Sequence, residues 1–460
     1  MSRENISEKS RKSSYEIDMI HGALMPKLIT FFIPLMFSGM LQLLFNAVDL
    51  VVVGRFAGSE PLAAVGATTS LINMFANLFI GISLGANVVA ARYIATEDDR
   101  NVSETVHTAI TIAAIMGVTM MFVGFFLSPI GLRLMDTPDN VISMSITYMR
   151  IYFLGMPFFI VYNYGAAILR ATGDTKRPLY FLIIAGIINA VLNMILVIIF
   201  EKGVAGVAFA TIFAQMITCI LVLRCLIKTD ENYRFEFSKI HINTKILKKI
   251  FFIGVPAAIQ SVVISFSNVL LQSSVNSFGS ISMAGYTAAN NLFGFMFVAV
   301  DSISQACMSF TSQNYAVRNM NRVKTVLKDC MLLVFVVTLV LGILVYGFGP
   351  ELLSLYNPDV DVIAAGMKIL TYTTVSYFLC GFMHCIPGSL RGLGHSSIPM
   401  ILSIIGTVGI RILWIYVFFP FNRTLDFLFV SYPVSWVSTF IMQLCCLLIV
   451  FNRMQKKNPV

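Results

Sequence analysis

Long apolar runs separated by short polar segments dominate the chain from about residue 28 onward. Twelve of these runs have about 20 residues or more, the length at which a helix crosses a hydrocarbon core of about 30 Å. They do not alternate between apolar and polar residues as the strands of a membrane barrel do, and an unpaired backbone in lipid is too costly. The pattern predicts an all-α polytopic membrane protein with twelve transmembrane helices.

Composition agrees with this prediction. Hydrophobic residues make up 57% of the 460 residues and charged residues only 12%, whereas soluble domains carry about 25% charged residues. The net charge of +9 comes without a basic stripe, so we expect no nucleic-acid partner and a lipid bilayer as the surroundings.

The basic residues indicate the orientation, because Lys and Arg concentrate in alternate polar segments. Only Arg55, Arg133, Lys202 and Arg423 fall in the other segments. The positive-inside rule therefore predicts that both termini are cytoplasmic.

The longest polar stretch divides the runs six and six. We predict a cytoplasmic tail at residues 1–23, a six-helix lobe at 24–226, a cytoplasmic linker at 227–249, a second six-helix lobe at 250–452 and a tail at 453–460.

The two halves carry the same motif. Leu-Arg-x-x-Gly-x-x-x-x-Pro spans residues 169–178 and recurs at 390–399, and nearly the same distance separates Pro34 from Pro256. Collinear matches of this kind indicate a duplication. Because six spans are an even number, both lobes enter from the same side and are parallel, pseudo-symmetric repeats. Two such lobes around a central site are typical of an alternating-access transporter, so we do not expect an enzyme.

Polar side chains inside the runs are candidate functional residues, because they are costly in lipid. Asp49 lies in the outer half of the first run. At 1.5 Å per residue, Asn193 and Thr211 share its depth, and Asn189 lies one turn further in. Carboxylate, amide and hydroxyl oxygens suit Na+, and a buried carboxylate also suits proton carriage. We predict a cation-coupling site. The alternatives are a helix-end acid at Asp49, helix–helix hydrogen bonds at the asparagines and a backbone bond at Thr211.

Four other charged side chains lie within the runs and are predicted to line a substrate cavity. They are Asp301, Arg150, Lys368 and Arg411. A water-solvated acid is the alternative for Asp301, and snorkelling to the surface is the alternative for Arg150 and Lys368. Three cations against two acids argue against a purely polycationic substrate, so a zwitterionic or anionic one remains open.

The chain resembles the multidrug and toxic compound extrusion (MATE) family over about residues 24–452. The resemblance rests on the six-plus-six layout and on ordered motifs: Val48-Asp49-x4-Gly54, Gly81-x-Ser83-x-Gly85, the two Leu-Arg-x-x-Gly segments and Asn189-x3-Asn193. It implies export of small organic compounds driven by an H+ or Na+ gradient, with no other cofactor. It further implies a bending first span at Pro34, with Pro256 as the matching hinge, and a bacterial inner membrane. We expect a monomer.

The sequence departs from the family pattern in the second lobe and at one site position. Asn193 stands where many members carry Asp, the seventh span has no acid, and the tenth has only Lys368. Coupling should therefore run through the first lobe, and its single carboxylate favours H+ over Na+. A lipid-linked oligosaccharide flippase of the same superfamily is the alternative, although three membrane cations give it only a thin basic lining.

Overall fold

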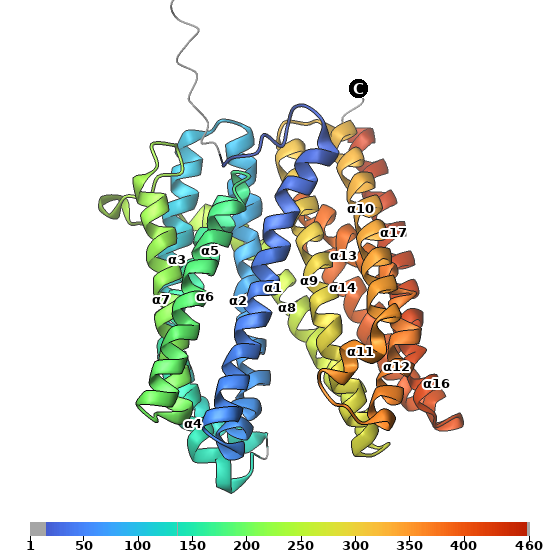
Figure 1. The fold of residues 1–460 in the computed structure, drawn as a ribbon. Coiled ribbons are helices and arrows are strands. Elements are labelled where there is room, and N and C mark those ends of the chain that lie inside the picture. The colour runs from blue at the N-terminus through green and yellow to red at the C-terminus, as the bar shows by residue number, and fades with distance from the viewer. Residues whose placement is uncertain (1–14, 136, 458–460) are drawn as a thin grey trace, which may run out of the picture.

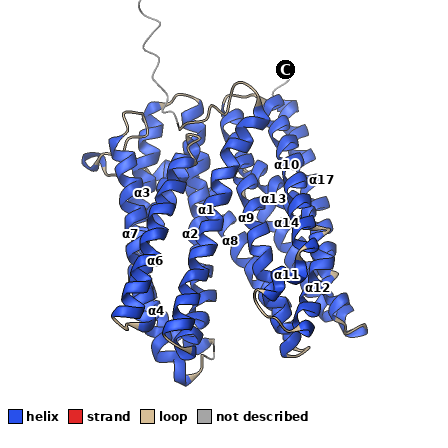
Figure 2. Cartoon of the chain, in the orientation of Figure 1, coloured by secondary structure: helices blue, strands red, loops and turns tan. Residues whose placement is uncertain are grey.

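A computed structural model describes residues 15–135 and 137–457, and within these ranges the chain is almost entirely helical, without a strand (Figure 2). Ten helices are long and apolar enough to cross a membrane, and two further bent helix pairs bring the spans to twelve. The prediction of an all-α membrane protein with twelve spans is confirmed.

The first lobe is built from six spans. They are α1 (Leu24–Phe56), α2 (Ser59–Ala95), α3 (Asp99–Leu134), α4 (Asp139–Leu154) with α5 (Met156–Ala171), α6 (Lys176–Met194) with the π-helical η1 (Ile195–Ile199), and α7 (Gly203–Lys228). The α4–α5 span is bent by 46°. The bend follows from Gly155 at the break and Pro157 in the first turn of α5, where no intrahelical N–H is needed.

The second lobe repeats this layout. Its elements are α8 (Thr244–Asn276), α9 (Ser280–Ala316), α10 (Met320–Gly347), α11 (Gly349–Ser354), α12 (Val360–Thr374), α13 (Tyr377–Gly392), α14 (Ser397–Ser403), η3 (Ile404–Gly409), α15 (Ile410–Leu413), η4 (Trp414–Phe418), η5 (Phe419–Phe421), α16 (Leu425–Phe429) and α17 (Ser431–Lys457). Three pairs of matching helices have equal lengths: α1 and α8 have 33 residues, α2 and α9 have 37, and α5 and α13 have 16. The α12–α13 span is bent by 50°, as α4–α5 is bent. The two parallel, pseudo-symmetric lobes are therefore present as predicted.

The lobes meet at one end of the molecule, the terminal end, where α1 begins and α17 finishes (Figure 1). There α2 packs against α8 through glycines. A Cβ on Gly85 would overlap the backbone of Ile250, and one on Gly254 would overlap the backbone of Ile82. Small residues let two membrane helices approach closely, so this contact depends on the absence of side chains.

Hydrogen bonds add to the closure of the terminal end. Arg92 Nη2 donates to the Gly392 carbonyl at 2.9 Å, and Gln313 Nε2 donates to the Ala171 carbonyl at 2.7 Å. Ser309 Oγ donates to Asn87 Oδ1 at 3.0 Å. Every side-chain hydrogen bond between the lobes that the described ranges contain lies in this half of the molecule.

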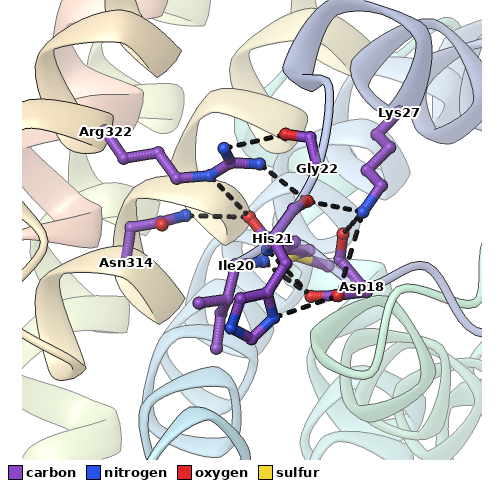
Figure 3. A network of polar contacts seen from close by, with 8 residues as sticks. Asp18, Ile20, His21, Gly22, Lys27, Asn314 and Arg322 are labelled. Atoms are coloured by element: carbon purple, nitrogen blue, oxygen red, sulfur yellow. Dashed lines mark hydrogen bonds and ion pairs between the residues drawn. The ribbon is translucent and has the colours of Figure 1, made fainter.

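The segment 15–23, ahead of α1, lies at this end, where side chains of the second lobe contact it (Figure 3). Met19 is fully buried, and its carbonyl accepts from Asn314 Nδ2 of α9 at 3.0 Å. The Arg322 guanidinium, at the start of α10, donates to the carbonyls of Gly22 at 2.9 Å and His21 at 3.0 Å. The segment is therefore tied to the second lobe through its backbone.

The same segment also contacts the first lobe and the linker. Ile17 lies against Gly173, and the Tyr233 hydroxyl donates to Glu16 at 2.6 Å. Burial alone would raise the pKa of Asp18, but backbone N–H groups that donate to its carboxylate, the Lys27 charge and His21 lower that pKa to about 2. Asp18 thus stays ionised at physiological pH and holds the turn before α1.

At the opposite end, the far end, the lobes diverge (Figure 1). Gly66 lies on nearly the same face of α2 as Gly81, which meets α8, but a Cβ there would find nothing within 4 Å. The two lobes are therefore in contact at the terminal end, and their helices diverge at the far end.

The polar segment between the lobes folds onto α3. The Glu236 N–H donates to His107 Nε2 at 3.0 Å, and the Asn243 N–H donates to Thr108 Oγ1 at 3.0 Å. Helix α8 already begins at Thr244, so residues 244–249 of the predicted linker are helical.

Candidate functional site

The predicted cation-coupling residues meet in the far half of the first lobe. Asp49 on α1 is only 6% exposed. Its carboxylate accepts from the Nδ2 of Asn193 on α6 and from the Thr211 hydroxyl on α7 at 3.2 Å. Three spans distant in sequence thus converge on one buried acid, and a buried carboxylate persists only where hydrogen bonds or a bound cation compensate it.

Asn193 organises this cluster. Its Nδ2 donates both to Asp49 and, at 3.1 Å, to the Oδ1 of Asn189 one helical turn away. Its own Oδ1 is buried and has no hydrogen-bond partner in the described residues. Thr211 also donates to the Val207 carbonyl at 3.0 Å, so the backbone bond and the Asp49 bond share one hydroxyl. The cluster therefore contains a spare acceptor oxygen beside a carboxylate.

Two aromatic residues of this site were not predicted from the sequence. Tyr148 and Tyr152 on α4 stack with ring centroids 6.3 Å apart, and both lie within electrostatic range of Asp49. In the sequence, the feature that could have indicated them is their spacing of one helical turn, which places both on the same face of α4.

Asp301 lies on α9, in the terminal half of the second lobe. It accepts from Gln305 Nε2 at 2.7 Å, and the cations in its electrostatic range are Arg391 and Arg170. These arginines are the matching residues of the duplicated motif, one from each lobe, so the motif supplies paired charges to the junction of the lobes. The sequence indicated the duplication but not this role.

The other three predicted cavity residues do not gather around Asp301. Arg150 Nε donates to the Phe125 carbonyl at 3.2 Å inside the first lobe. Lys368 pairs with Asp426 at 3.5 Å and its side chain is 51% exposed, which fits the snorkelling alternative. Arg411 is buried within the second lobe. The structure thus separates the four residues into different environments.

The two prolines predicted as hinges, Pro34 and Pro256, lie at matching positions inside α1 and α8. Pro34 offers no N–H to the carbonyl of Thr30, which weakens the helix at that point. The Ser38 hydroxyl donates to the Pro34 carbonyl at 2.8 Å. Both prolines lie in the terminal half, near the contacts that close the molecule.

Chemically, the Asp49 cluster can take up one proton or hold a small hard cation. Its donor set of one carboxylate, two amide oxygens and one hydroxyl contains only oxygen ligands. The described residues around it provide no thiol–imidazole pair or second carboxylate for catalysis.

Comparison with known proteins agrees with the two-lobe helical fold. The MatE family model matches residues 34–195 and 256–417, one copy in each lobe. YoeA of Bacillus subtilis (strain 168), named a probable multidrug resistance protein, is 29% identical over 415 residues, which cover 88% of this chain and 89% of that protein. The multidrug export protein MepA of Staphylococcus aureus (strain MSSA476) is 21% identical over 386 residues, covering 84% of this chain and 85% of that protein.

Solved structures share the fold. An outward-facing multidrug resistance MATE family transporter matches with a TM-score of 0.89 at 21% identity, covering 97% of this chain and 100% of that chain. A MATE protein in a bent conformation matches with a TM-score of 0.86 at 22% identity, covering 94% of this chain and 97% of that chain. Because the family model covers most of both lobes, the chain belongs to the multidrug and toxic compound extrusion family, whose members are membrane transporters and not enzymes.

Proposed function

We propose that the chain is a secondary antiporter of the bacterial inner membrane that exports small organic solutes by alternating access, in exchange for H+ taken up at Asp49. The observation that carries the proposal is the buried Asp49 carboxylate, held by Asn193 and Thr211 from two other spans. An acid in this position changes the stability of its surroundings when it gains or loses a charge.

The hydrogen-bond directions favour H+ over Na+ as the coupling ion. The Asn193 amide N–H groups point at the oxygens of Asp49 and Asn189, so they fill the space in which a metal ion would contact both. Sodium could bind there only after this amide turned away. A protonated carboxyl is a donor, and it can supply the bond that the buried Oδ1 of Asn193 lacks.

Helix α1 is suited to transmit the change because it touches both lobes. Phe31 packs on Phe310 of α9, with ring centroids 5.6 Å apart, and Gly39 lies against Val298. Six residues further along α1, Phe45 lies against Gly186 of α6. We infer that proton uptake at Asp49 alters the α1–α6 contact, and that α1 bends near its proline as the lobes rock.

With cytoplasmic termini, the far end faces the outside, and this conformation is the outward-open one. Cysteine labelling tests the orientation. An impermeant reagent added outside should label Asn422→Cys and not Ser238→Cys in intact cells, both positions being exposed. The reverse pattern contradicts the proposal.

Transport in liposomes tests the proposed function. The purified protein should accumulate a fluorescent organic dye when a pH difference alone is imposed, and should not do so with a sodium difference alone. Accumulation that follows only sodium would reassign the coupling ion, and equilibration without accumulation under either gradient would reject antiport.

A further inference from the structure

Arg411 is a buried cation without an acid. Its side chain is 3% exposed, and it forms none of the ion pairs found among the described residues. The titratable groups in its electrostatic range are Tyr432, Tyr286 and Cys380, all ordinarily neutral at physiological pH. Burying a guanidinium without a counter-charge is costly, so this region of the second lobe is electropositive and favours an anion.

The hydrogen bonds of Arg411 fix the orientation of one neighbour. Its Nη1 donates to Asn268 Oδ1 at 2.8 Å. Arginine can only donate, so the Asn268 oxygen must face Arg411 and the amide N–H groups must face away. Neither this amide nitrogen nor Arg411 Nη2 has a hydrogen-bond partner in the described residues, and Asn268 is exposed.

The face of α8 that carries Asn268 points toward the other lobe. Ile250, Gly254 and Ala258 of this face pack against α2 at the terminal end. The next positions at helical spacing are polar, and they lie where the lobes have parted: Ser261, Ser265, Asn268 and Gln272. An exposed N–H pair backed by a buried guanidinium therefore faces the space between the lobes.

We propose that Asn268 and Arg411 form a subsite for the carboxylate group of an anionic or zwitterionic organic solute. The carboxylate accepts from the Asn268 amide and from Arg411 Nη2, while Ser435 and Ser267 hold the guanidinium through bonds of 3.3 and 3.4 Å. The Tyr432 ring, whose centroid lies 4.6 Å from the Arg411 Cζ, supports the cation from one face. This assignment names a substrate class and so rests on the proposed export function.

A matched pair of dyes provides the test. Rhodamine B carries a carboxylate, and its ethyl ester has the same chromophore without it. Fluorescence polarisation with purified protein in lipid nanodiscs should show tighter binding of the acid than of the ester, and an excess of benzoate should displace only the acid. Equal affinity of the wild type for both dyes overturns the proposal.

Two variants locate the effect. Asn268→Asp keeps the shape and the acceptor toward Arg411 but replaces the outward donors with negative charge. It should weaken binding of the acid at least about tenfold and leave the ester unchanged or tighter. Arg411→Gln should act in the same direction, with partial recovery in Arg411→Lys. Gln272→Glu is the control, because it adds the same charge one turn further out on the same face, and it should change binding by less than about threefold.

Wild-type affinity of Asn268→Asp for the acid, or an equal loss of both dyes, overturns the subsite. An equal loss in Asn268→Asp and Gln272→Glu would assign the effect to general electrostatics and also reject it. The measurement uses no ion gradient, so failure of gradient-driven transport in liposomes would reject the export function and leave the binding result standing.

Discussion

Asp49→Asn tests the coupling site with little change of shape. The new amide oxygen can still accept from Asn193, and the new amide N–H can donate to the hydroxyl oxygen of Thr211, so the hydrogen bonds to both partners can be kept. What the variant loses is the ability to gain and release a proton. We therefore expect normal folding and solute binding, with loss of coupling alone.

The size of the effect follows from the driving force. For one proton exchanged per solute, a pH difference of one unit supplies about 1.4 kcal/mol and sustains a solute ratio of at most about tenfold. Wild-type liposomes should approach that ratio for a fluorescent dye, whereas Asp49→Asn should stop at equal concentrations on both sides. Dye fluorescence inside liposomes, recorded after imposing the pH difference, gives the ratio directly.

Asp301→Asn is the matched control, because Asp301 is the other intramembrane acid and lies in the second lobe with Gln305 as its hydrogen-bond partner. It should retain pH-driven accumulation, even if its rate changes. Accumulation by Asp49→Asn at the wild-type ratio, or its loss only in Asp301→Asn, would refute the assignment of the coupling site.

Other substitutions test the contacts at the terminal end. Gly85→Ala sets a methyl group against the backbone of α8 and should weaken the contact between α2 and α8 by about 1–3 kcal/mol. Cysteines placed between α2 and α8 should then be labelled faster by a thiol reagent. Gly66→Ala, whose methyl group meets no neighbour, should leave the labelling rate unchanged, and equal effects of the two variants would contradict the packing. Arg322→Ala removes the hydrogen bonds to the backbone of the 15–23 segment and should speed proteolysis of that segment, whereas Arg322→Lys should be cleaved at an intermediate rate. An unchanged rate of proteolysis in Arg322→Ala would contradict the proposed attachment of the segment to the second lobe. The hydrogen bond with Glu104 raises the pKa of His241. The protonated pair therefore stabilises the docking of the linker on α3 at pH values below the ordinary histidine pKa. This stabilisation is lost as the pH rises through the raised pKa of His241. Proteolytic cleavage of the linker should therefore be faster above that pKa in the wild type, and its rate should not depend on pH in His241→Gln. A cleavage rate of the wild type that does not depend on pH would contradict the pairing.

Depth along a span could be predicted from the sequence, and it was sufficient to group the residues of the proposed coupling site. Counting 1.5 Å per residue gave Asp49, Asn193 and Thr211 one level, and the structure joins all three by hydrogen bonds. The spans and the duplication were equally accessible, because apolar length and repeated motifs are local features of the sequence.

The direction in which a side chain points could not be predicted in the same way, because it depends on how each span is rotated and bent. Arg150 and Lys368 were given similar depths on matching spans, yet one donates to a backbone carbonyl within its lobe and the other pairs with Asp426 at the surface. Both spans are bent, by 46° and 50°, and such bends turn the residues beyond them. Tyr148 and Tyr152, on the first of these spans, were missed for the same reason.

The distance between the far ends of the two lobes tests most directly whether the charge on Asp49 sets the direction in which the molecule opens. Spin labels at Ser59→Cys and Ser280→Cys, exposed at the matching starts of α2 and α9, can be introduced after replacing the native cysteines. Pulsed electron paramagnetic resonance should show a distance distribution that changes between mildly acidic and mildly alkaline pH in the wild type. In Asp49→Asn it should keep the acidic form at every pH. A pH-dependent shift that persists in Asp49→Asn would contradict the proposed coupling.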